Sequence, residues 1–254
     1  MGFSAEWLAL REPVDRAARH DGLLQRAANL AGDNPVILDL GCGTGATQRA
    51  FSGLLPNHSQ WRLVDNDAGL LEQACSENEH SATTHKMDLN QIEALPLDGV
   101  TLVTASALLD LVSYAWVSDL VARLNVPFYA ALSYNGIMSW NPTHEADNAV
   151  VEAFNSHQCT DKGFGSALGP DAAEHSAKIF SDAGFDVETA SSPWHVGPSS
   201  KTLHVELIDG IAQAASEAGA QTAKDWRNAR RENAQNSNCV VGHVDLLANP
   251  ANTS

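Results

Sequence analysis

The feature that most constrains the fold of this chain is a glycine-rich turn that follows a short apolar run. The run, residues 36–38, has the length and the branched side chains of a buried parallel strand, and a helix is predicted over residues 46–54. Glycines between a strand and a helix let the backbone approach a polar ligand closely, and the free N–H groups of a helix start favour negative charge. The turn therefore predicts an α/β fold with a cofactor site, and it reads Asp39-Leu40-Gly41-Cys42-Gly43-Thr44-Gly45.

The same strand-and-helix pattern repeats along the rest of the chain. Apolar runs rich in β-branched residues predict further strands at residues 61–64, 84–87, 100–105, 126–134, 185–189 and 239–247. Helical spacing predicts helices at residues 5–31, 68–77, 116–124, 146–157 and 170–183, and from Ser199 or Ser200 to about residue 215. This alternation predicts a doubly wound, mostly parallel, seven-stranded sheet covered by helices on both faces.

The length of 254 residues suits one elaborated domain. We expect residues 1–254 to form it, with residues 1–32 as a helical lid and with insertions at 135–170 and 199–236 that shape a substrate pocket. The start of the chain lacks the basic and apolar regions of a signal peptide. No apolar run approaches the roughly 18 residues that cross a bilayer. We therefore expect a cytoplasmic protein without a membrane partner, and we predict no oligomeric state.

Two kinds of cofactor use a turn of this type. Gly41, Gly43 and Ala46 fit the glycine spacing of dinucleotide-binding proteins, which would make the chain a nicotinamide-dependent oxidoreductase. The carboxylate of Asp39 opposes a pyrophosphate at this place but is compatible with a sulfonium cofactor. Asp65, 24 residues after Gly41, ends the second predicted strand, where a carboxylate binds ribose hydroxyls in either case. The turn alone favours the sulfonium cofactor through Asp39.

Four ordered motifs over residues 36–134 resemble those of class I, Rossmann-like S-adenosylmethionine-dependent methyltransferases. They are the glycine turn, Val64-Asp65-Asn66-Asp67, Lys86-Met87-Asp88-Leu89, and the stretch from Thr104 to Leu111 at the end of the fourth predicted strand. The resemblance implies that the last strand of the sheet runs antiparallel and that the cofactor is S-adenosyl-L-methionine. It implies as cofactor-binding residues Asp39, Gly41, Gly43, Gly45, Asp65, Asn66, Met87, Asp88, Leu89 and Ser106.

A charged stretch precedes the glycine turn, from Arg11 to Arg19. In related enzymes a basic residue ahead of the turn often meets the carboxylate of the cofactor. Arg19, or alternatively Arg11, is expected to do so through a bidentate pair. Arg16 and Asp15 are equally compatible with a solvated helix face.

Charge and motif content narrow the class of substrate. Lys and Arg number 15 against 31 Asp and Glu, a formal net charge of −16 that repels nucleic acids. The (D/N)PP(Y/F) motif of enzymes that methylate amino groups of bases is absent, and no Cys lies between Cys75 and Cys159 for attack on cytosine C5. Asp147 and Asn148, the one suggestive metal-ligand pair, fit an exposed helix start better, so we predict no metal.

The remaining substrate class is a small organic molecule. Its binding site is expected beyond the carboxyl ends of the strands. Polar residues that follow the fifth predicted strand supply candidate catalytic groups: Tyr134, then His157 as a base, with Asp161 beside it. A protein that binds S-adenosylmethionine without catalysis, and whose insertion serves as an interaction surface, is the alternative of a different class.

Overall fold

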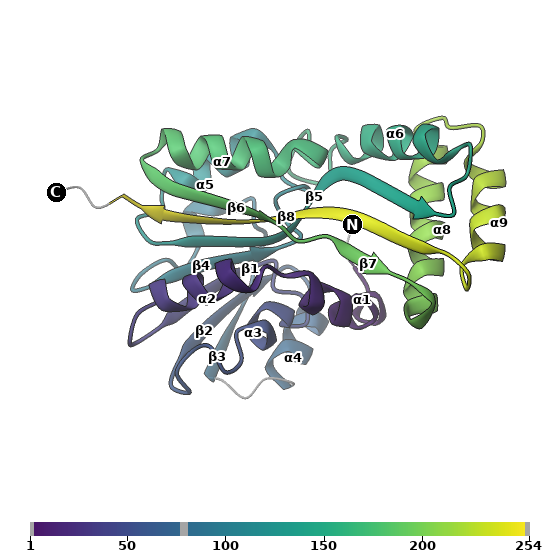
Figure 1. Cartoon of the computed structure of the whole chain (residues 1–254). Helices are drawn as coiled ribbons and strands as arrows, with labels where there is room; N and C mark the ends of the chain where they lie inside the picture. The colour runs from purple at the N-terminus through teal and green to yellow at the C-terminus, as the bar shows by residue number, and fades with distance from the viewer. Residues whose placement is uncertain (1–2, 77–80, 252–254) are drawn as a thin grey trace.

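A computed structural model describes residues 3–76 and 81–251 of the chain, and its centre is one twisted sheet (Figure 1). The strand order is β3-β2-β1-β4-β5-β8-β6, with a short β7 paired to β8. Neighbours from β3 to β5 are parallel, and β8 is antiparallel to both β5 and β6. The strands are β1 (Val36–Leu40), β2 (Gln60–Asp65), β3 (Ser81–Lys86), β4 (Leu102–Ser106), β5 (Phe128–Asn141), β6 (Phe185–Ser191), β7 (Trp194–Val196) and β8 (Asn238–Pro250).

The predicted sheet is confirmed in its class, its mostly parallel strands and its antiparallel last strand, and it differs from the prediction in two details. It has eight strands over the described residues, because residues 194–196 pair with β8. In addition, β5 continues to Asn141, where the sequence indicated a loop after Tyr134. Register shifts along β5 let this long strand follow β8 past Asn135 and Gly136.

Helices cover both faces of the sheet, as predicted. The helices α2 (Asp21–Leu30) and α4 (Ala68–Ser76) bury apolar side chains in a core on one face, and α3 (Ala46–Ala50) buries the polar side chains of Thr47 and Gln48. The helices α5 (Tyr114–Val121) and α7 (Ala172–Asp182) bury apolar side chains in a second core on the other face, where Phe128 of β5 stacks on Phe180 of α7. The 3-10 turns are η1 (Ile92–Ala94), η2 (Gly169–Asp171) and η3 (Pro198–Ser200).

The remaining helices gather at the end of the sheet toward which β5 points (Figure 1). They are α1 (Ala5–Ala18), α6 (Asp147–Gln158), α8 (Lys201–Glu217) and α9 (Ala223–Asn233). Helix α8 packs between α6 and α9, and α1 packs on β7. Within the described residues, no helix is both long and apolar enough to span a bilayer.

Helix α9 was not predicted, because its sequence is almost entirely polar, and it contains the basic cluster Arg227, Arg230 and Arg231. Arg227 and Arg231 pair with Asp209 at the surface. Arg230, by contrast, is buried and forms an ion pair with Asp147. The interpretation of Asp147 as an exposed helix start was therefore wrong: its carboxylate is buried and also accepts a 2.8 Å hydrogen bond from Nε1 of Trp226.

Candidate functional site

A cavity opens at the carboxyl edge of the parallel strands, between the glycine turn, the ends of β2 and β4, and helix α1. Edge loops of a doubly wound sheet form such a cavity because the carboxyl ends of parallel strands meet there. Its wall contains polar residues of the four motifs together with side chains of α1. The cofactor-binding residues predicted from sequence that line it are Gly41, Gly43, Asp65, Asn66, Asp88, Leu89 and Ser106.

The glycine turn has the left-handed backbone conformation that glycine adopts without strain, with φ of 65° at Gly41 and 53° at Gly43. A Cβ at Gly43 would lie 3.0 Å from Leu8 Cδ1 of α1, so the lid packs directly on the turn. Gly45, with φ of 84°, ends the turn outside the cavity wall. Helix α3 is only five residues long, so the helix dipole expected at this turn is small.

Asp65 joins the second motif to the first. One carboxylate oxygen accepts a 2.9 Å hydrogen bond from the backbone N–H of Gly43, and the other accepts a 3.0 Å bond from Asp67 N–H. Both oxygens keep a second lone pair, so the carboxylate is fixed at the cavity wall and can still accept two hydroxyl donors. Asp67 caps α4 through bonds to the N–H groups of Gly69 and Leu70.

The third motif forms a further part of the wall. Asp88 lines the cavity, and its Oδ1 accepts bonds of 2.9 Å and 3.0 Å from the backbone and side chain of Asn90. Leu89 presents an apolar surface beside it, and its carbonyl oxygen accepts a 2.9 Å bond from Trp116 Nε1. Met87 packs into the core beneath and does not reach the wall.

Two charged groups lie under the cavity floor rather than in its wall. Asp39 is fully buried and accepts a 2.8 Å hydrogen bond from Thr104 Oγ1. Burial raises the pKa of this carboxyl to about 7, although Thr104 and Arg19 oppose the shift. Arg19 is also buried and donates to Ser106 Oγ at 3.0 Å and to Thr47 Oγ1 at 3.5 Å, while its Nη1 has no partner among the described residues.

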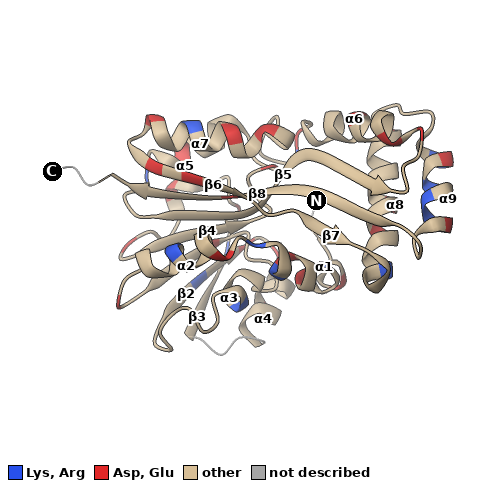
Figure 2. Cartoon of the chain, in the orientation of Figure 1, with Lys and Arg blue, Asp and Glu red and all other residues tan. Residues whose placement is uncertain are grey.

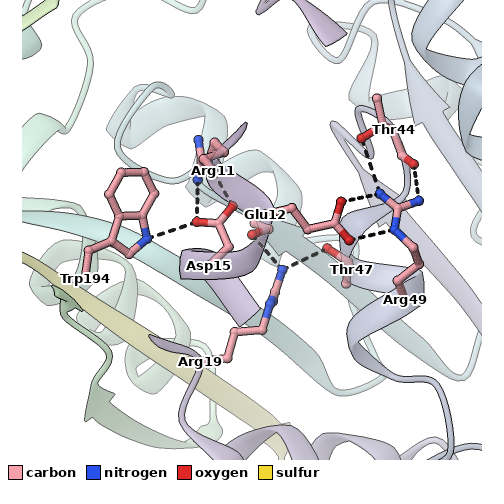
Figure 3. Close-up of polar contacts among 9 residues, drawn as sticks. Arg11, Glu12, Asp15, Arg19, Thr44, Thr47, Arg49 and Trp194 are labelled. Carbon is pink, nitrogen blue, oxygen red and sulfur yellow. Dashed lines mark hydrogen bonds and ion pairs between the residues drawn. The ribbon is translucent and has the colours of Figure 1, made fainter. Parts of the chain in front are cut away.

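A network of charged side chains, which was not predicted from the sequence, holds helix α1 over the cavity (Figure 3). Glu12 forms two hydrogen bonds with Arg49, of 2.7 Å and 2.6 Å, and Arg49 also donates to the carbonyl oxygen of Thr44 in the glycine turn at 2.6 Å. Arg11 and Asp15 form a buried bidentate pair that lines the cavity. The spacing of four residues between these two opposite charges was the available signal for a helical pair.

The structure does not bring the three predicted catalytic residues to the cavity wall. His157, at the end of α6, lies 3.0 Å from Glu217 of α8 and contacts Lys162. Asp161 accepts hydrogen bonds from the N–H groups of Gly163 and Gly165 and so shapes its own loop. Tyr134 is buried in β5, where its hydroxyl donates a 2.7 Å bond to Asn155. These arrangements give all three residues local roles, and the catalytic prediction for them stays untested.

Across residues 3–76 and 81–251, no group of three His, Cys, Asp or Glu residues is placed to bind a metal ion.

Comparisons with known proteins relate this chain to a methyltransferase family model and to solved structures of similar fold. Residues 37–126 match the family model described as a methyltransferase domain. A putative methyltransferase of Bacillus halodurans has a similar solved structure, with 14% identity, a TM-score of 0.54, and coverage of 90% of this chain and 99% of that one. The YcgJ protein of Bacillus subtilis is similar as well, with 14% identity, a TM-score of 0.51, and coverage of 91% of this chain and 99% of that one. The cyclopropane synthase MmaA2 of Mycobacterium tuberculosis has 13% identity, a TM-score of 0.51, and coverage of 97% of this chain and 94% of that one. No curated protein matches the sequence.

Proposed function

We propose that this protein is an S-adenosylmethionine-dependent methyltransferase that acts on a small organic molecule, because residues 37–126 match the family model of a methyltransferase domain and the sheet has the class I arrangement. The observation that carries the proposal is the convergence of all four motifs on one cavity under α1. When bound, S-adenosylmethionine supplies a methyl group on a sulfonium, which an acceptor atom attacks in line.

The residues at the cavity fit this cofactor. The carboxylate of Asp65, with two backbone donors already satisfied, suits a ribose diol. Asp88 and Leu89 offer a hydrogen-bond acceptor and an apolar surface for an adenine ring. The buried Nη1 of Arg19 lacks a partner, and a carboxylate above Ser106 and Thr47 would supply one.

The lid and the charge of the chain support a small acceptor. Phe3, Leu8, Arg11 and Asp15 line the cavity from the N-terminal segment, an arrangement that suits a small molecule better than a duplex. Figure 2 shows acidic positions on α7, β6 and α9, and the chain carries a formal net charge of −16. Such a surface repels phosphate backbones. Residues 1–32, 135–170 and 199–236 are proposed to shape the acceptor side, and the site of action is proposed to be the cytoplasm.

Transfer of a labelled methyl group tests the proposal. The protein is incubated with methyl-labelled S-adenosylmethionine and a cell extract, which is then separated into small-molecule, protein and nucleic-acid fractions. We expect label in the small-molecule fraction with the wild type and much less with Asp65→Ala. Label confined to protein or nucleic acid would contradict the small-molecule class. Binding of S-adenosylhomocysteine without transfer into any fraction would favour the non-catalytic alternative.

A further inference from the structure

Two buried polar atoms that lack a hydrogen-bond partner among the described residues belong to residues that do not line the cavity but interact with Arg11, which does. The first is Oδ1 of Asp110, on the segment after β4 whose Leu108 and Leu111 line the cavity. The backbone of Asp110 is fixed, because Gly169 N–H donates a 3.0 Å bond to its carbonyl oxygen. Its carboxyl interacts with the guanidinium of Arg11 and with the backbone N–H of Tyr134. The carboxyl therefore lies between the lid helix and the bulged part of β5.

The second atom is Nδ1 of His243, which lies opposite Tyr134 in the register of β5 and β8. The imidazole centroid lies 5.0 Å from that of the Trp194 ring and 6.2 Å from that of the Tyr134 ring. Above Trp194, the guanidinium carbon of Arg11 lies 5.1 Å from the indole centroid. Asp110 and His243 thus belong to one cluster that surrounds Tyr134 and Arg11 beneath α1.

The charges in this cluster do not cancel. Burial raises the pKa of Asp110 to about 6, and burial together with Arg11 lowers the pKa of His243 to about 3. At neutral pH the carboxyl is therefore mainly ionised and the imidazole is uncharged. Arg11 is neutralised by Asp15, through hydrogen bonds of 2.8 Å and 3.2 Å. Arg11 is thus shared between two carboxylates, Asp15 and Asp110, and these three side chains together carry a net negative charge.

We propose that Asp110 and His243 bind the methyl acceptor and that the acceptor presents an amine nitrogen. The inference rests on the proposed function and adds the acceptor class to it. A buried carboxylate oxygen can only accept hydrogen bonds and is stabilised by a positive partner. An amine in its protonated form supplies both the charge and several N–H donors. An acceptor carrying a carboxylate or phosphate at this point would be repelled by Asp110.

The apolar part of the cavity wall indicates the body of the acceptor. Phe3 and Leu8 of the lid, with Leu111 and Phe164, line the cavity and present apolar surface. An amine on a compact apolar skeleton fits this combination. Oδ1 of Asp110 and Nδ1 of His243 are both buried, and Arg11 of α1 interacts with both side chains, so the proposal requires α1 to move when the acceptor enters.

The transfer step balances with these residues. Asp110 accepts the proton of the ammonium form, which frees the nitrogen lone pair. That lone pair forms the new N–CH3 bond as the C–S bond of S-adenosylmethionine breaks, and the electron pair of the broken bond stays on sulfur as a neutral thioether. A carboxyl whose pKa is near 6 is suited to hold a proton transiently at neutral pH. His243 accepts a second N–H hydrogen bond and so positions the nitrogen.

The test uses the full chain, S-adenosylmethionine labelled with 13C in the methyl group, and a metabolite extract split by ion exchange into cationic, neutral and anionic fractions. NMR of the product distinguishes N-methyl from O-methyl and S-methyl carbon. We expect N-methyl product in the cationic fraction. We expect Asp110→Asn to slow transfer by about 10²- to 10⁴-fold, as loss of a proton acceptor does, with unchanged binding of S-adenosylhomocysteine. Asp119→Asn, an exposed acid on α5, is the matched control and should not change the rate.

His243→Gln tests the same cluster should Asp110→Asn fail to fold, and its transfer should also be slower. Product found only as O-methyl or S-methyl carbon would overturn the amine class. N-methyl product formed at the wild-type rate by Asp110→Asn and His243→Gln would overturn the site. A protein that binds S-adenosylhomocysteine but labels no fraction would overturn this inference while leaving the cofactor site in place. Absence of S-adenosylhomocysteine binding would instead contradict the proposed function itself.

Discussion

The carboxylate of Asp65, at the end of β2, accepts a 2.9 Å hydrogen bond from the backbone N–H of Gly43 in the glycine turn. This bond fixes the second cofactor motif relative to the first without using the charge of Asp65 for an ion pair. The carboxylate therefore remains available at the cavity wall.

Replacing Asp65 by Ala should weaken S-adenosylhomocysteine binding by about 1–3 kcal/mol, because a hydrogen bond to a charged group is lost. Titration calorimetry gives the value. Asp67→Asn is the matched control on the same loop, since Asn also caps a helix, and it should bind almost as well as the wild type. Equal losses of binding free energy in Asp65→Ala and Asp67→Asn would show that binding depends on the total charge of the loop and not on the position of the Asp65 carboxylate.

Replacing Asp39 by Asn should stabilise the free protein at pH 8 relative to the wild type. Burial raises the pKa of Asp39 from its ordinary value of 3.8 to about 7 in the fold, so between these values the folded state holds a proton that the unfolded state has lost. Wild-type stability therefore falls as pH rises from about 4 to about 7, and Asn removes that fall. Thermal unfolding at pH 5 and pH 8 measures the difference, with the exposed Asp98→Asn as control. A difference that does not grow with pH would contradict the buried, raised pKa.

Replacing Glu12 by Gln should loosen the lid and speed the release of S-adenosylhomocysteine. Glu12 holds Arg49, which in turn bonds to the glycine turn. The hydrogen bond from Arg49 lowers the pKa of Glu12 below its ordinary value of 4.5. The stabilisation is therefore present above about pH 4.5 and is lost as pH falls through the lowered pKa. Stopped-flow dissociation at pH 7 and thermal unfolding from pH 7 to pH 3 measure both effects.

The control for Glu12→Gln is Arg16→Gln, which removes the exposed partner of Glu12 at 3.7 Å. An exposed pair contributes little, so release and stability should stay near the wild type. Equal release rates and equal stabilities of Glu12→Gln and Arg16→Gln would contradict the conclusion that the Glu12–Arg49 pair holds the lid in place.

Replacing Asp147 by Ala should destabilise the fold by about 3–5 kcal/mol, because Arg230 would remain buried without its partner. The double variant Asp147→Ala, Arg230→Met should recover part of the loss, since no unpaired charge remains. Asp209→Ala, whose partners Arg227 and Arg231 are exposed, should cost less than about 1 kcal/mol. Urea unfolding of the four proteins compares them, and similar losses for Asp147→Ala and Asp209→Ala would show that the Arg230 pair is solvated.

The strands of the sheet were predictable because most of them contain apolar runs rich in branched residues, and the antiparallel last strand follows from the family resemblance. Helix α9 escaped prediction because its polar sequence carries only two large buried anchors, Trp226 and Arg230, which no periodic pattern reveals. Strand β7 is three residues long and exists through pairing with β8. The extension of β5 likewise depends on β8 rather than on Asn135 and Gly136 themselves.

The cofactor side of the site was predictable for a topological reason. Its residues follow consecutive parallel strands, whose carboxyl ends meet at one edge. The acceptor side depends on how α1 and α6 pack, which the sequence does not specify. His157 was chosen by residue type, and the packing of α6 on α8 turns it toward Glu217. His243 escaped notice because it sits inside an apolar strand, where a histidine resembles a core residue.

The most direct test of the central claim compares two ligands of the free protein by titration calorimetry. S-Adenosylhomocysteine and NAD are titrated separately into the wild type and into Asp65→Ala. The account predicts that S-adenosylhomocysteine binds the wild type with one site per chain, that Asp65→Ala weakens this binding, and that NAD gives no saturable heat. Saturable binding of NAD without binding of S-adenosylhomocysteine would contradict it.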